Sequence, residues 1–208
     1  MSPRKVNKDE KRREIALKCS DLIHEVGMKK LTVAEVAKTA DIGKGTIYEY
    51  FENKEDIIFE IINIHIEKHN KELLEQIQKV KTTKEKIELF FRMVLSDDEE
   101  NQKHFNGYKE FLSIVLSEDN AAMKEFNCNK NEFFEGELLK IFAHGVEEGE
   151  LKAESLGLVN GILTYQKGLA LRKMTQNSFN ANEDFEKFIN TVFKLIEIKK
   201  WYIRNMKK

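Results

Sequence analysis

The sequence predicts an all-α fold, and two observations lead to this prediction. Apolar residues recur at steps of three and four along most of the chain, whereas the strict alternation typical of strands is hard to find. The only proline is Pro3, so no proline interrupts a helix in the rest of the 208 residues. We expect about nine helices, arranged as an N-terminal three-helix helix-turn-helix domain and a larger C-terminal helical domain.

The composition favours a cytoplasmic protein without disulfides. Its two cysteines, Cys19 and Cys128, lie far apart, and no run of about 18 apolar residues is long enough to span a membrane. The charged N-terminus lacks the apolar segment of a signal peptide. Residues 1–54 hold 12 Lys and Arg against 9 Asp and Glu, a small basic excess that permits contact with nucleic acid.

The first helix is expected from about residue 8 to 26, because its apolar residues fall on one stripe and Gly27 follows it. This stripe leaves Arg12 and Arg13 in solvent. A short second helix is expected from 32 to about 39, where Thr32 and Glu35 form a capping-box pattern.

A turn at residues 41–43 then leads into another short helix, from Lys44 to about Tyr50. Two short helices joined by such a turn form a helix-turn-helix unit. Asp41 is expected in the left-handed conformation, which Asp tolerates better than most residues. Ile47 and Phe51 are expected to face the core.

Asn53 is expected to cap a long fourth helix, from 54 to about 79, that connects the two domains. We therefore assign residues 1–53 to the helix-turn-helix domain and 54–208 to the second domain. Further helices are expected at about 84–96, 102–117, 121–148, 153–175 and 183–204.

The start of the helix at Lys44 has the chemistry of an anion site. Gly43 and Gly45 leave backbone N–H groups uncovered there, and Lys44 is unfavourable beside the positive helix end unless an anion is present. Thr46, Glu49 and Tyr50 are expected on the exposed face, within reach of bases or phosphates.

Residues 32–57, TVAEVAKTADIGKGTIYEYFENKEDI, resemble the DNA-binding signature of the tetracycline-repressor (TetR) family of bacterial transcription regulators. The resemblance covers about residues 10–62. It implies a homodimeric repressor that binds double-stranded DNA at an inverted-repeat operator and is released by a small effector. No serine or cysteine lies in a nucleophile motif, and residues 43–45 are too short for a nucleotide-binding loop, so we expect no enzymatic activity and no cofactor. Two residues depart from the family pattern, since Asp41 stands where glycine is common and Gly43 where a small hydroxyl residue is common.

The residue chemistry and the resemblance together give the predicted contacts with DNA: Thr32, Lys44, Gly45, Thr46, Tyr48, Glu49, Tyr50 and Lys54.

The resemblance also implies that the larger domain binds the effector and forms the dimer. Eight of the fourteen phenylalanines fall between residues 85 and 150, which suits a hydrophobic effector of unknown identity. The candidate ligand-binding residues are Phe111, Phe134 and Tyr165. The last two helices carry apolar residues beyond one face, and the candidate dimer residues on them are Ile162, Leu169, Phe188, Val192, Leu195, Ile198 and Tyr202.

Two other functions stay open on the sequence alone. A helix-turn-helix that no longer reads DNA would act as a protein-interaction module, and weak salt dependence of binding would indicate it. His65 and His69 lie four residues apart on one helix, a spacing that suits a metal-responsive regulator, although polar surface residues explain them better and we expect no metal.

Overall fold

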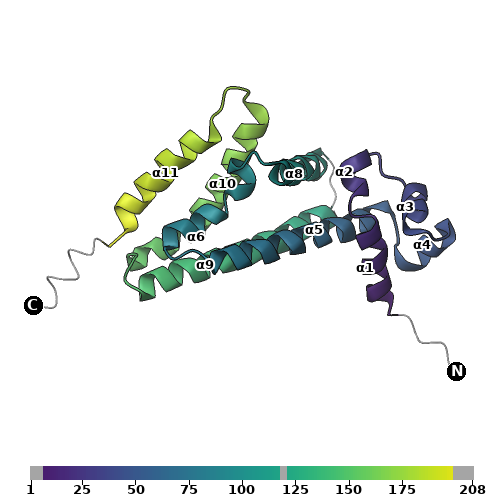
Figure 1. Cartoon of the computed structure of the whole chain (residues 1–208), viewed down its shortest axis with the longest axis horizontal. Coiled ribbons are helices and arrows are strands. Elements are labelled where there is room, and N and C mark those ends of the chain that lie inside the picture. Colours follow the sequence, from purple (N-terminus) through teal and green to yellow (C-terminus); the bar gives the residue numbers. More distant parts are fainter. Residues whose placement is uncertain (1–6, 118–120, 199–208) are drawn as a thin grey trace, which may run out of the picture. The chain divides into compact units, whose positions relative to one another are not determined.

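The computed structural model describes residues 7–117 and 121–198, and every regular element in these ranges is a helix (Figure 1). The all-α prediction is thereby confirmed. The chain divides into two compact units, Met1–Glu75 and Gln76–Lys208, and each is described by itself. The proposed domain boundary after residue 53 falls inside the first unit and stays a prediction.

The first unit is built from short helices around a small apolar core. Its elements are α1 (Lys8–Lys18), α2 (Leu22–Val26), α3 (Val33–Ala40), α4 (Lys44–Tyr50) and the greater part of α5 (Lys54–Ile77). Helices α1, α3 and α4 pack against one another. Ile15, Val36, Ile47 and Phe51 are each at most 1% exposed, which confirms that Ile47 and Phe51 face the core.

Local side-chain caps start α3 and α5 where the sequence predicts them. The Thr32 hydroxyl accepts a hydrogen bond from the Glu35 N–H, and the Glu35 carboxylate accepts one from the Thr32 N–H, so both halves of the capping box are present. The Asn53 side-chain oxygen accepts from the Asp56 N–H at 2.8 Å. These caps satisfy backbone donors that have no partner within their own helix.

Asp41 ends α3 in the left-handed conformation, with φ 58° and ψ 47°, as predicted. The Ile42 N–H donates to the Ala37 carbonyl and the Asp41 N–H to the Lys38 carbonyl. This pair of bonds is the Schellman motif, in which the left-handed residue is usually glycine. Asp41 therefore reverses the chain between α3 and α4 at some steric cost, which a short polar side chain keeps small.

The single first helix predicted for residues 8–26 is wrong, because the chain breaks between α1 and α2. The Leu22 N–H donates to the Cys19 carbonyl, three residues back rather than four, at 3.1 Å. The Ser20 carbonyl accepts a hydrogen bond from the Nε2 of His65 on α5, at 2.8 Å. A donor on a distant helix thus replaces a bond within the helix.

In the second unit, several helices pack around α10. Its elements are α6 (Thr83–Leu89), α7 (Arg92–Leu95), α8 (Glu99–Ser117), α9 (Ala121–Glu147), the 3-10 helix η1 (Ala153–Leu158), α10 (Val159–Thr175) and α11 (Ala181–Ile196). Helix α10 packs against α7, α9, α11 and η1 (Figure 1). The predicted helix at 84–96 is divided into α6 and α7, and the predicted helix at 153–175 begins as η1.

The break between α6 and α7 again involves a donor from elsewhere in the chain. The Gln166 side-chain amide on α10 donates to the Phe90 carbonyl. The carbonyls at the end of α7 are also bonded from outside, because Lys173 donates to Val94 and Asn182 to Leu95. These bonds fix α7 against α10 and α11.

The predicted bounds of the last helix, 183–204, are wrong, because α11 begins at Ala181 and ends at Ile196. It starts earlier, because the Asn180 side chain caps it by accepting from the Glu183 N–H. It stops at Ile196, because Glu197 forms an isolated antiparallel bridge with Leu151. Residues 199–204 lie outside the described part of the chain.

A close contact joins the start of α6 to the end of α9. Thr83, 2% exposed, donates both its N–H and its hydroxyl to the Glu150 carboxylate, at 3.0 and 2.6 Å. A Cβ added to Gly145 would stand 2.5 Å from the Thr83 hydroxyl oxygen. Glycine at position 145 therefore allows α9 to approach this bonded pair.

Gly145→Ala is expected to destabilise the protein by about 1–3 kcal/mol, because the added methyl group must displace the Thr83 hydroxyl, which is hydrogen-bonded to Glu150. Urea-induced unfolding measures this change. Gly136→Ala on the same helix is the matched control: a Cβ there meets nothing within 4 Å, so the better helix propensity of alanine should stabilise by up to about 1 kcal/mol. Equal effects of the two substitutions would contradict the contact.

Candidate nucleic-acid interface

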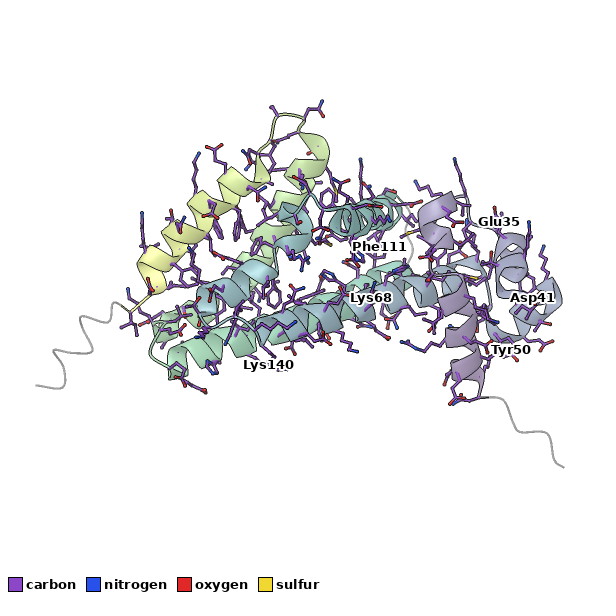
Figure 2. The ribbon with its side chains drawn as sticks, viewed as in Figure 1. Glu35, Asp41, Tyr50, Lys68, Phe111 and Lys140 are labelled. Atoms are coloured by element: carbon purple, nitrogen blue, oxygen red, sulfur yellow. The ribbon has the colours of Figure 1, made fainter. Side chains whose placement is uncertain are left out.

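Helix α4 exposes one face and buries the other. Four residues on its outer side, spaced three and four apart, are exposed: Lys44, Gly45, Tyr48 and Glu49. Ile47 on the inner side is 0% exposed, and Thr46 and Tyr50, which lie four residues apart and therefore on the same side of the helix, are half-buried. The first unit therefore presents a defined outer face of α4, bordered by Asp41 at one end and Tyr50 at the other (Figure 2).

Tyr48 lies at the centre of this face and is 53% exposed. From the sequence, the ring of Tyr48 could be assigned equally well to the core or to the surface, because tyrosine suits both environments. In the structure the core position beside it is filled by Ile47, so the ring of Tyr48 is available to an outside partner. Thr46 and Tyr50 contribute less exposed surface than Tyr48 does.

The start of α4 has no side-chain cap. Gly43 is the N-cap residue, with φ −65° and ψ 144°, and no side chain accepts from the first backbone N–H groups of the helix. The first backbone bond of the helix is from the Ile47 N–H to the Gly43 carbonyl, at 3.3 Å. These N–H groups, together with the exposed Lys44, suit an anion such as a phosphate.

Thr32 and Lys54, two predicted phosphate contacts, each have one hydrogen committed to the protein. The Thr32 hydroxyl donates to the Glu35 carboxylate at 2.8 Å, and its hydrogen bonds hold the pKa of Glu35 below its ordinary value. The Lys54 amine donates to the Lys29 carbonyl at 2.8 Å. An ammonium group has three hydrogens, so Lys54 keeps two for a phosphate, whereas Thr32 has no second hydroxyl hydrogen to donate.

Arg12, expected in solvent, instead fastens α4 to α1 and α5. Its guanidinium donates to the Tyr50 carbonyl at 2.7 Å and makes two bonds with the Asp56 carboxylate, at 2.9 and 2.6 Å. It also lies over the Phe51 ring, 4.7 Å from the centroid. No local pattern in the sequence indicates this role, because the partners lie about 40 residues away. The end of α4 is thus fixed while its start is open.

The hydrogen bond from Arg12 and the bond from the Glu52 N–H hold the pKa of Asp56 below its ordinary value, although burial opposes them. The neighbouring Arg13 differs, since it pairs only with Glu67 in a largely exposed ion pair. Two consecutive arginines on α1 therefore have different surroundings.

The predicted ligand residues lie in different aromatic contacts of the second unit. Phe111 packs edge-on against Phe126, with ring centroids 6.0 Å apart, and Phe134 packs against Phe90 at 6.4 Å. Tyr165 stacks on Phe188 at 3.6 Å. No ring contact of the described residues joins the three candidates directly, and their role stays a prediction.

The hydroxyl of Tyr165 already has a partner. It donates to Asp184 at 2.9 Å, and burial together with this bond raises the pKa of Tyr165. Arg172 also binds Asp184, at 3.0 Å, so this carboxylate fastens α10 to α11.

The predicted dimer residues differ in their exposure. Ile162 and Leu169 are 2% and 1% exposed within the single chain, so they belong to the core of their own unit. On α11, Phe188, Val192 and Leu195 form a second stripe beside the buried one; Phe188 and Val192 are half-buried, and Leu195 is 66% exposed. Ile198 lies beyond α11, where its N–H donates to the Glu150 carbonyl. Tyr202 lies outside the described residues.

In the described ranges, no three His, Cys, Asp or Glu side chains are grouped so that they could hold a metal ion. One ring nitrogen of His65 faces the Ser20 carbonyl, which leaves the metal hypothesis without structural support. No helix in the described ranges is both long and apolar enough to cross a membrane.

The sequence and the structure both match known regulatory proteins. The model of the family "Bacterial regulatory proteins, tetR family" matches residues 20–61. The fatty acid metabolism regulator protein of Bacillus subtilis is 30% identical over 138 residues, which make up 64% of this chain and 66% of the relative. The match therefore spans slightly less than two thirds of that relative.

Two solved structures share the fold. A TetR-family transcriptional regulator from Cytophaga hutchinsonii superposes with a TM-score of 0.74 at 18% identity, over 94% of this chain and 100% of that one. The regulator FadR from Bacillus subtilis, solved in complex with stearoyl-CoA, has a TM-score of 0.59 at 22% identity, over 88% of this chain and 95% of that one.

Arg12→Gln is expected to destabilise the protein by about 2 kcal/mol, because it leaves the Asp56 carboxylate and the Tyr50 carbonyl without their charged donor. Chemical denaturation measures this loss. Arg13→Gln is the matched control and should cost less than about 1 kcal/mol, because its ion pair is exposed.

The same interaction gives a pH dependence. A lowered carboxyl pKa stabilises the fold above the pKa of the unfolded state, and this stabilisation is lost as the pH falls through the folded pKa. The difference in stability between the unsubstituted protein and Arg12→Gln should therefore shrink below about pH 4. A difference that stays constant from pH 7 to pH 3 would contradict the assigned role of Asp56.

Proposed function

Because the chain belongs to the tetR family of bacterial regulatory proteins, whose members are DNA-binding transcriptional regulators, we propose that it is a cytoplasmic homodimeric repressor. The outer face of α4 enters the major groove of an inverted-repeat operator, and the second unit binds a small effector. The observation that carries this proposal is the exposed, glycine-containing face of α4 with its uncapped start.

Gly45 supports the placement of DNA on this face. A Cβ at position 45 would meet nothing within 4 Å, so the fold does not require glycine there. Glycine also lowers helix stability relative to alanine. Gly45 therefore weakens its own short helix without a packing reason. Close approach of an outside partner to the backbone at this position accounts for the glycine.

The remaining predicted contacts surround Gly45. Lys44 and the uncapped N–H groups bind a phosphate at the start of α4, and Lys54 binds another at the start of α5. Tyr48 and Glu49 face the base edges, with Thr46 and Tyr50 together along one flank. Thr32 orients α3 as its cap. We keep it among the DNA contacts, but its hydroxyl hydrogen is donated to Glu35, so its contact with DNA does not use that hydrogen.

We propose that the dimer forms through Val192 and Leu195 of α11, together with Leu171 on α10, and that Phe188, which stacks on Tyr165 of its own chain, borders this surface. Leu171 is 51% exposed and was not singled out by the sequence pattern. A two-fold axis through such a surface makes the same stripes meet. The two copies of α4 then read half-sites about 34–36 Å apart, one helical turn of DNA.

We further propose that the effector is hydrophobic, with an acyl-CoA as the first class to test. The relative from Bacillus subtilis is named for fatty acid metabolism, and the structural neighbour FadR was solved with stearoyl-CoA. The aromatic contacts of Phe111, Phe134 and Tyr165 provide apolar surface in the second unit, where these residues stay our candidates for the ligand contacts.

Gly45→Ala is expected to weaken operator binding by about tenfold, a change of about 1.4 kcal/mol, because the methyl group would hold α4 away from the duplex. The same substitution should stabilise the free protein by up to about 1 kcal/mol. Mobility-shift titration and thermal unfolding measure the two effects. Gly136→Ala on α9 is the control, with gained stability and unchanged DNA affinity. Unchanged affinity of Gly45→Ala would place the DNA elsewhere.

Stearoyl-CoA is expected to lower operator affinity by roughly 5- to 150-fold, the usual range of coupling between two sites. It should also raise the unfolding temperature, because a ligand that binds only the folded state stabilises it. Coenzyme A alone and stearate alone are the controls for the two halves of the molecule. If stearoyl-CoA changes neither DNA binding nor the unfolding temperature, the acyl-CoA class is wrong while the DNA-binding proposal stands.

A further inference from the structure

The outer face of α4 carries a carboxylate, which is unexpected on a surface that meets DNA. Lys44 and Glu49 lie at the two ends of this face, with Gly45 and Tyr48 between them. A helix of 7 residues is about 10 Å long at 1.5 Å per residue. The major groove is about 12 Å wide and admits an α-helix, which is about 10–12 Å in diameter with its side chains, so a helix this short can lie in the groove along its whole length. Glu49 therefore lies in the groove when Gly45 and Tyr48 of the same face enter it.

The fold gives no reason for a carboxylate at position 49. In residues 7–117 and 121–198 no hydrogen bond or ion pair of the Glu49 side chain is found. Glu35 on α3 is a contrast, because its carboxylate completes the capping box with Thr32. Near phosphates a carboxylate is repelled, so its presence on this face requires a compensating donor from the DNA.

The major groove offers few donors. Cytosine presents its N4 amino group and adenine its N6 amino group, whereas guanine and thymine present only acceptors. Adenine also presents the N7 acceptor beside its amino group, which suits the amide of Asn or Gln and repels a carboxylate. The base that an ionised glutamate accepts from most favourably is therefore cytosine.

We propose that Glu49 determines sequence specificity by selecting a cytosine at one position of each operator half-site. The inference rests on the proposed function, because it requires α4 in the major groove. It goes further by naming the base and the residue that reads it. Lys44 supplies affinity through a phosphate, and Glu49 supplies discrimination between bases.

The test is a selection of binding sites from random double-stranded DNA with the full-length protein, followed by titration of the selected duplex with each base pair exchanged. The unsubstituted protein should select an inverted repeat with one cytosine per half-site that is preferred at least about fivefold. Glu49→Gln should prefer adenine at that same position and leave the other positions unchanged. Glu49→Ala should lose the preference at that position only.

Glu25→Gln is the matched control, because it removes one exposed carboxylate from α2 and should leave all base preferences unchanged. Selection of the same site by Glu49→Gln and by the unsubstituted protein would overturn the role of Glu49 and leave the proposed function intact. If the unsubstituted protein selects no DNA sequence at all, the proposed function fails and the inference fails with it. Thermal unfolding confirms that these exposed substitutions leave the fold intact.

Discussion

The structure depends on how the carbonyl groups at helix ends find hydrogen-bond donors. The last carbonyls of a helix have no partner within it, and a buried carbonyl without a donor is costly. Here long side chains from other helices supply several of these donors: His65 to Ser20, Arg12 to Tyr50, Gln166 to Phe90 and Lys173 to Val94. Each such bond lies at or next to the end of a helix and fixes that end against another element of the same unit.

The candidate interface follows from this constraint applied to one short helix. An isolated helix of 7 residues would not be stable in water, so α4 exists only because the rest of the first unit holds it. Ile47 anchors its inner side, and Arg12 bonds its last turn through the Tyr50 carbonyl. The start needs no protein partner if a phosphate completes it. The same helix is thus ordered at one end by the fold and open at the other to a ligand.

Local signals in the sequence predicted most of the first unit. The capping box of Thr32, the Asn53 cap and the left-handed Asp41 each depend on residues within a few positions, and all three were predicted correctly. The breaks after α1 and α6 were not, because the donors that cause them, His65 and Gln166, lie 45 and 76 residues away in sequence.

The candidate site shows the same division between local and distant causes. The helical period of α4 predicted an exposed face of Thr46, Glu49 and Tyr50; Glu49 is exposed, whereas Thr46 and Tyr50 are half-buried, because packing within the first unit covers their side of the helix. The role of Arg12 was missed, because an arginine on an amphipathic helix gives no sign of which distant carboxylate it contacts.

Arg12 would also couple movement of α5 to movement of α4. Its guanidinium binds both the end of α4 and Asp56 in the first turn of α5, so a displacement of α5 either carries α4 with it or breaks charged hydrogen bonds. An effector that shifts α5 would therefore change the position of the α4 face that we propose meets DNA, and a coupling of about 1–3 kcal/mol is comparable to the strength of these bonds.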